Sequence, residues 1–236
     1  MKKLITTIAF IALSTVSAKA IDMEMFSLTA GLAANQGVFG ASATETNRAE
    51  DNTVKSIKKE SGVFTESYGS QFIELGLGRF ISIGYEHTPD SVSTPTNTTR
   101  HGNAAGENNV SVDFNDLNTT YLKINLPGGI YAKTGNVETD LDVKEVMGSG
   151  STYKNVSTSG TMMALGYQTF IKDSGFGLRF EGSYMELDPV TTSNGVATDG
   201  GSITNGGRNQ IDAKNLEGLT GKVALTYTFG KSGNSF

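Results

Sequence analysis

The chain has 236 residues, 29 of them glycine, and contains neither cysteine nor tryptophan. Only 18% of the residues are charged, against about 25% in an ordinary soluble domain. The formal net charge of −5 excludes a strongly basic surface for nucleic acid. The absence of cysteine excludes a disulfide scaffold, a thiolate metal site and a cysteine nucleophile.

The first twenty residues have the pattern of an export signal. Lys2 and Lys3 precede an apolar segment at residues 4–13, and Ala18 and Ala20 form the A-x-A pattern of a signal-peptidase site. This mostly apolar segment of ten residues is too short for a membrane-spanning helix, which needs about 20. We therefore predict that residues 1–20 are a Sec-type signal peptide cleaved after Ala20 and that residues 21–236 form one domain.

Apolar residues alternate with polar or small ones along most of the remaining chain. Near its end, Val223, Leu225 and Tyr227 lie on one face of an extended chain, and Ala224 and Thr226 lie on the other. This period of two is typical of a β-strand, because a helix would scatter the same residues around its axis. The predicted strands are residues 26–34, 71–77, 80–86, 119–126, 130–137, 161–171, 176–184 and 219–229.

The connections between these strands are of two alternating kinds. Short turns contain glycine, which supplies positive φ where a turn needs it, and longer loops are rich in Asn, Thr, Ser and Gly. The turns are residues 78–79, 127–129 and 172–175, and the loops are residues 47–61, 88–109, 147–152 and 192–208. Short turns at one end and long loops at the other are typical of outer-membrane barrels. The predicted fold is all-β: an antiparallel up-and-down transmembrane β-barrel of about eight strands.

The same alternation would also suit a soluble, lipocalin-like barrel, which buries its apolar face. Two features favour the inverted arrangement, with lipid outside. The polar face consists mainly of Ser, Thr, Gly and Ala, which suit a narrow interior and lack the charges of a water-facing exterior. Aromatic residues, among them Phe26, Phe176, Tyr227 and Phe229, gather near strand ends, as an interfacial girdle requires.

The order of these elements resembles small outer-membrane β-barrel proteins of Gram-negative bacteria, the OmpA/OmpX-type group, and is similar to surface antigens of alphaproteobacteria. The resemblance runs from SLTAGLAANQGVFG near the start to GLTGKVALTYTFG near the end. It implies a place in the outer membrane, contact with its lipid, and insertion by the barrel-assembly machinery. It also implies that an aromatic residue ending the last strand is the assembly signal. Tyr227 with Phe229 fits that description, and Phe236 is a second candidate.

If the apolar face meets lipid, the opposite parity sends a set of charged side chains into the barrel. Unpaired charges in a narrow interior are costly, so we expect three acids and four bases to form a network of ion pairs, with Lys222 facing Glu181. The network would act either as a structural plug or as a charged constriction that passes small solutes. Its predicted members are Glu74, Glu86, Lys123, Lys133, Arg179, Glu181 and Lys222.

Candidate catalytic residues are few. The only histidines are His87, which continues the outward parity of its strand, and His101, which lies in a loop. By resemblance, an outer-membrane lipid A acyl hydrolase would need a serine close after the histidine, but His87 is followed by Thr88 and Pro89. The carboxylates of residues 138–142 alternate along a strand without the glycine or ligand spacing of a calcium loop. We predict no catalytic residue, no metal site and no cofactor.

We therefore expect a structural or surface-exposed outer-membrane protein. Porin-like activity through a small pore is compatible with the same sequence. The alternative is a binding module, an adhesin or surface antigen, whose long loops engage an external ligand. An enzyme that modifies outer-membrane lipid ranks third, so the expectation is that the protein is not an enzyme. The expected partners are outer-membrane lipid and the barrel-assembly machinery, and nucleic acid is not among them.

Overall fold

The computed structural model describes residues 26–49, 51–100, 107–146, 152–171, 174–195 and 208–230. The predicted signal peptide with its cleavage point at Ala20, His101 in its loop, and the second candidate assembly signal Phe236 all lie outside the described residues.

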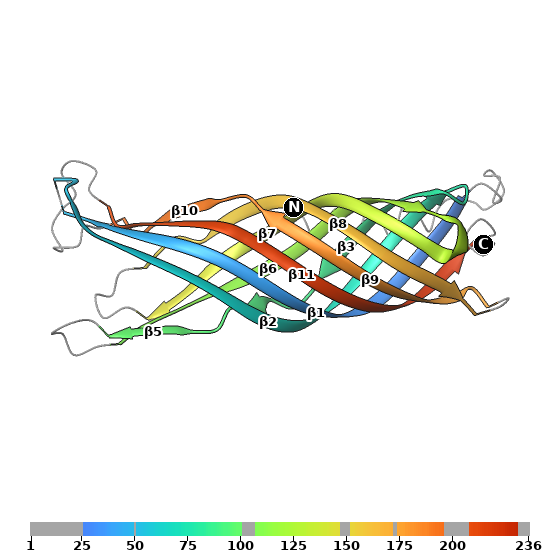
Figure 1. The fold of residues 1–236 in the computed structure, drawn as a ribbon, viewed down its shortest axis with the longest axis horizontal. Coiled ribbons are helices and arrows are strands. Elements are labelled where there is room, and N and C mark those ends of the chain that lie inside the picture. The colour runs from blue at the N-terminus through green and yellow to red at the C-terminus, as the bar shows by residue number, and fades with distance from the viewer. Residues whose placement is uncertain are drawn as a thin grey trace, which may run out of the picture.

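Eight antiparallel strands of the described chain close into a barrel, with three short strands and one turn of 3₁₀ helix attached (Figure 1). The ring runs β1-β2-β3-β6-β7-β8-β9-β11 and closes because β11 pairs with β1. The prediction of an all-β up-and-down barrel of about eight strands is confirmed. The ring strands are β1 (Phe26–Arg48), β2 (Val54–Leu77), β3 (Ile81–Thr88), β6 (Glu107–Asn125), β7 (Ile130–Val146), β8 (Val156–Phe170), β9 (Phe176–Leu187) and β11 (Gln210–Phe229); the additions are β4 (Val92–Ser93), β5 (Asn97–Arg100), β10 (Val190–Ser193) and η1 (Pro127–Gly129).

The alternation of side chains along the strands matches the two faces of the barrel wall. On β11, Leu225 is 51% exposed on the outside, whereas its neighbours Ala224 and Thr226 are 1% and 3% exposed on the inside. Each predicted strand lies within a strand of the structure to within one residue at either end. None of the described residues forms a helix long and apolar enough to cross a membrane.

An apolar band encircles the barrel along one half of its length. Leu32, Ile83 and Leu165 lie on this band, and each is more than 60% exposed. Along β1 the outer face is apolar from Phe26 to Ala34 and becomes polar at Gln36. Nine residues span about 30 Å along a strand, which a tilt near 40° reduces to about 23 Å. This height matches the roughly 25 Å apolar band of outer-membrane barrels.

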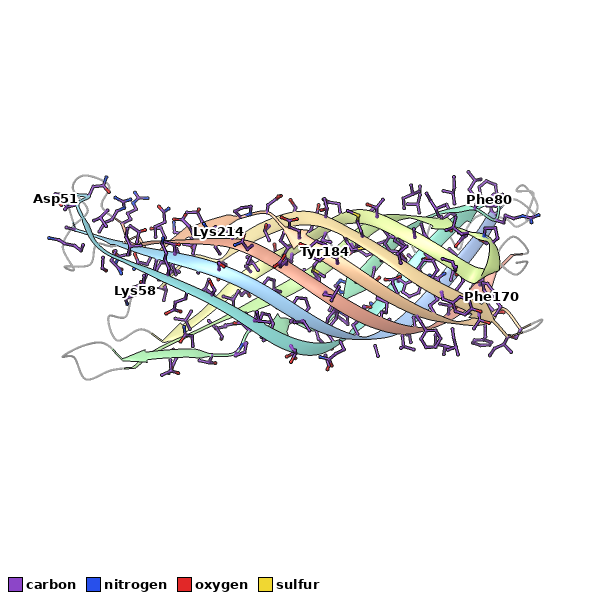
Figure 2. All side chains as sticks on the ribbon, viewed as in Figure 1. Asp51, Lys58, Phe80, Phe170, Tyr184 and Lys214 are labelled. Atoms are coloured by element: carbon purple, nitrogen blue, oxygen red, sulfur yellow. The ribbon has the colours of Figure 1, made fainter. Side chains whose placement is uncertain are left out.

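The short connections mark what we call the turn end of the barrel, and the opposite end is the loop end. Figure 2 places Phe80 and Phe170 at the turn end and Asp51 and Lys58 at the loop end. At the turn end Tyr227 stacks edge-on against both Phe176 and Phe229, with ring centroids 4.8 and 4.6 Å apart. These rings lie where an interfacial aromatic girdle is expected.

The strands extend further towards the loop end than predicted. Most of the predicted loop at residues 47–61 is strand, because β1 and β2 continue to a tight turn in which the backbone N–H of Ala49 donates to the carbonyl of Thr53. The backbone N–H of Thr53 bonds the Asp51 carboxylate and lowers its pKa. Residues 54–63 are exposed on both faces, so no apolar alternation marks them as strand. The predicted loops at 88–109 and 192–208 likewise contain β4, β5, the start of β6 and the end of β10.

Candidate functional site: the interior of the barrel

All seven predicted inward charges lie inside the barrel within the height of the apolar band. They come from β2, β3, β6, β7, β9 and β11, and their side chains in the ion pairs are between 1% and 10% exposed. The structure divides them into two groups. We call them the Glu74 group (Glu74, Lys123 and Arg179) and the Glu181 group (Glu181, Glu86, Lys133 and Lys222).

Glu74 is the centre of the first group. The Arg179 guanidinium donates two parallel hydrogen bonds to the two Glu74 carboxylate oxygens, each 2.6 Å long. Lys123 Nζ lies 2.5 Å from Glu74 Oε2, and the Tyr121 hydroxyl donates to Oε1 at 2.9 Å. The bidentate pairing holds both planar groups in one orientation. Because β2 and β9 are not neighbours in the ring, this contact crosses the interior.

Glu181 is the centre of the second group. Lys133 Nζ lies 2.7 Å from one of its carboxylate oxygens and Lys222 Nζ lies 3.0 Å from the other. Lys222 also bonds Glu86 at 2.6 Å, so it joins the two acids. Lys222 and Glu181 are directly opposite each other in the ladder between β11 and β9. The structure thus brings together the pair that strand order led us to expect.

Three aromatic rings fill the space between the charges, and sequence reasoning missed all of them. Lys133 Nζ lies 4.3 Å from the centroid of the Tyr121 ring, and the Arg179 guanidinium carbon lies 5.0 Å from that of Phe72. The Tyr131 hydroxyl donates to Glu181 at 2.9 Å. Each ring is two residues from a predicted inward charge on its own strand, so strand parity was the signal that could have found them.

Glycine makes room for two of these rings at the directly paired positions of the neighbouring strands. A Cβ atom on Gly31 would lie 2.2 Å from the Phe72 ring, and one on Gly84 would lie 2.3 Å from the Tyr121 ring. Both distances are far inside van der Waals contact. The barrel wall therefore accepts large rings in its interior only because these positions carry no side chain.

Towards the loop end the interior becomes apolar, which the small-residue pattern did not indicate. Leu117, Val137, Met162, Leu187 and Leu216 form a buried cluster there. A small cavity lies beside this cluster, with about 30 Å³ of space for the centre of a water-sized group. Its apolar lining includes Phe39, Phe64, Phe114 and Met185. The Phe39 and Phe64 rings stack with centroids 5.3 Å apart.

The remaining residues discussed from sequence lie away from this interior. His87 Nδ1 and the Asn118 side-chain oxygen are 2.7 Å apart. Asp140 accepts a hydrogen bond from Ser157, and Asp142 accepts one from Asn115. Among the residues the structure describes, no cluster of three or more His, Asp or Glu side chains could hold a metal ion.

Comparison with known proteins identifies the architecture. No protein-family model matches the chain, and no curated protein matches it in sequence. The outer membrane protein OprG from Pseudomonas aeruginosa is similar in structure, with a TM-score of 0.53 at 11% identity over 85% of this chain and 97% of that one.

Two further solved structures give lower scores. Ail of Yersinia pestis has a TM-score of 0.40 at 8% identity, over 84% of this chain and 99% of its own. The outer membrane protease OmpT from Escherichia coli has a TM-score of 0.41 at 10% identity, over 90% of this chain and 100% of its own. Taken with the closed ring of strands and its apolar outer band, the match to OprG gives this chain the fold of the small outer-membrane β-barrel proteins.

Proposed function

We propose that the protein is a sealed outer-membrane barrel that displays an extended β-structure at the cell surface. In this proposal the turn end faces the periplasm and the loop end faces outward. The apolar band, the aromatic girdle at the turn end and the predicted export signal support this placement. The protein is then a surface protein with a membrane anchor, and it does not act as a small-solute pore.

The observation that carries the proposal is the closed interior. The interior of an eight-stranded barrel is just wide enough for side chains to fill. Here the two charged groups and the rings of Phe72, Tyr121 and Tyr131 occupy it within the apolar band. An ion crossing this section would have to separate pairs joined at 2.5–3.0 Å. Because breaking a buried pair costs about 3–5 kcal/mol, we expect very low conductance.

Single-channel recording of the purified protein in planar bilayers tests the sealed interior. The wild type should show almost no current, and Arg179→Ala should raise the current while lowering thermal stability. Lys58→Ala is the control, because Lys58 is exposed at the loop end and should change neither. Steady, ion-selective current through the wild type, with selectivity but not stability altered by Arg179→Ala, would instead make the protein a small porin.

A second candidate function is binding of an external partner by the loop end. β2 pairs with β1 along nearly its whole length but with β3 only from Gln71 to Leu77. Over residues 54–70 no described strand pairs with the other edge of β2. The Asn97 side chain donates a hydrogen bond to Glu60 on this stretch, but the backbone edge itself forms no ladder with a described strand. Such an edge can accept an extended segment of another protein, and Lys55, Lys58 and Lys59 on it favour an acidic one.

Shortening the β1–β2 hairpin tests this second candidate. Residues 43–60 form the outer part of the hairpin, in which Ala43 pairs with Glu60. Their deletion should leave barrel folding intact, since the apolar band and the two charged groups lie elsewhere. Cells that display the shortened protein should attach less well to other cells and to surfaces than cells that display the wild type. Unchanged attachment in a correctly folded variant would remove the hairpin from any binding role.

We also propose that the protein acts without catalysis. The described histidine, His87, contacts the amide of Asn118, which fits a structural role on the barrel wall. An assay of lipid A deacylation and peptide cleavage by the purified protein would test this, and activity that His87→Ala abolishes would contradict it.

A further inference from the structure

The interior charges do not cancel, and the excess is confined to one group. In the Glu181 group two acids meet two bases, so the formal charge is −2 + 2 = 0. In the Glu74 group one acid meets two bases, so the formal charge is −1 + 2 = +1. The next carboxylate of the same parity on β2, Glu66, is eight residues from Glu74, or about 26 Å along the strand. It is too far away to neutralise the group.

A polar pocket at the turn end borders the Glu74 group. It leaves about 20 Å³ of space for the centre of a water-sized group, and its lining includes the cations Arg79, Lys123 and Arg179. Hydroxyl and amide side chains such as Thr29, Ser82 and Gln168 complete the polar lining, and none of the lining residues is acidic. The pocket therefore combines positive charge with hydrogen-bond donors.

Two buried polar atoms on residues that line the pocket make no hydrogen bond with the described residues. They are Nε of Arg179 and Oε1 of Gln168, on side chains that are only 3% and 5% exposed. Each of the two terminal nitrogens of Arg179 donates one hydrogen bond to Glu74. A buried N–H without an acceptor is rare and costly in folded proteins, so Arg179, which lines the pocket, calls for an acceptor that the described residues do not supply.

We propose that this pocket binds one small inorganic monoanion, of the size of chloride or dihydrogen phosphate. The anion accepts a hydrogen bond from Arg179 Nε–H and neutralises the single excess charge of the Glu74 group. Arg79 lies in the exposed turn between β2 and β3, so the anion enters from the turn end. The Glu74 and Glu181 groups block its passage further into the barrel, and the anion becomes part of the seal.

Thermal unfolding of the detergent-solubilised protein tests the proposal. At constant ionic strength, sodium chloride or sodium dihydrogen phosphate should raise the unfolding midpoint in a saturable way, because a ligand of the folded state alone stabilises it. Sodium gluconate, whose anion is too large for the pocket, should not raise the midpoint. For each salt, the concentration that gives half of the maximal rise in the unfolding midpoint is compared. The salt with the lower value contains the preferred anion.

Charge variants locate the effect in the pocket. Lys123→Gln removes the excess charge and should abolish the response to small anions, whereas Lys222→Gln, in the other group, should retain it. If Lys123→Gln does not fold, Thr29→Asp supplies a carboxylate on the pocket wall and should make the midpoint independent of the anion. An unchanged anion response in both Lys123→Gln and Thr29→Asp would overturn the proposal.

Crystals grown in sodium bromide give a direct view of the site. An anomalous peak within hydrogen-bond distance of Arg179 Nε is expected, and it should be absent from crystals of Thr29→Asp. A water molecule in that place, with bromide only on the outer surface, would refute the proposal even if the midpoint responds to salt.

Discussion

Replacing Glu74 by glutamine removes the one carboxylate that, among the described residues, bonds Lys123 and Arg179. Both cations are about 3% exposed, so the change leaves two charges in the interior without their acid. Removing one member of a buried ion pair costs about 3–5 kcal/mol, and less where water reaches the site through the polar pocket at the turn end. The side-chain volume is almost unchanged, so the loss measures electrostatics and hydrogen bonding instead of packing.

The matched control is Glu66→Gln, the same substitution on the same strand and with the same inward parity. Glu66 is only half-buried and forms no ion pair with the described residues, so its replacement should change the free energy of unfolding by less than about 0.5 kcal/mol. Urea unfolding in lipid vesicles, followed by far-UV circular dichroism because the chain lacks tryptophan, measures both variants.

A double variant separates the pair from the rest of the site. Adding Lys123→Met to Glu74→Gln removes one of the stranded cations, so the double variant should be more stable than the sum of the two single losses predicts. Equal stability of Glu74→Gln and Glu66→Gln, or strict additivity in the double variant, would refute the idea that a buried network holds the barrel closed.

Three further predictions test features outside the network. Leu165→Arg on the apolar band should destabilise the barrel by about 2–4 kcal/mol in bilayers, whereas Val63→Arg, exposed at the loop end, should be tolerated; equal tolerance would mean that the band faces water. Phe229→Ala should slow insertion by purified assembly machinery while removal of residues 230–236 should not; if loss of Phe236 alone stops insertion, the terminal residue is the signal. Amino-terminal sequencing of the protein extracted from membranes should begin at Ile21, and a mature species that keeps Met1 would disprove cleavage after Ala20.

The inward charges could be predicted from sequence because the barrel wall separates two very different environments. A period of two and an apolar outer face fix the direction of every side chain on a strand once one is known. Arg179 and Glu181 are therefore inward without further information. Strand order made Lys222 a candidate partner of Glu181, since it predicted that their strands are neighbours; the register that sets the two residues directly opposite each other comes from the structure.

Contacts across the interior could not be predicted in the same way. Arg179 bonds Glu74, which is 105 residues away on a strand that is not its neighbour. Their meeting depends on the stagger of all the strands around the ring, which no local pattern encodes. The loop-end extension of β1 and β2 was missed for a different reason: both of its faces meet water, so the apolar alternation disappears although the backbone ladder continues.

The interior of this barrel is charged although an apolar filling would avoid the cost of desolvating ions, and strand register offers a physical reason. A slip of β9 by one residue would turn Arg179 and Glu181 outward and Phe180 inward. An arginine that faces lipid near the middle of the bilayer costs about 2–4 kcal/mol, and the stranded Glu74, Lys133 and Lys222 would add the cost of unpaired charges. With apolar residues on both faces, the same slip would exchange one apolar side chain for another at little cost. We infer that the charged interior penalises wrong registers. The same ion pairs that seal the barrel then also select the correct register of its strands.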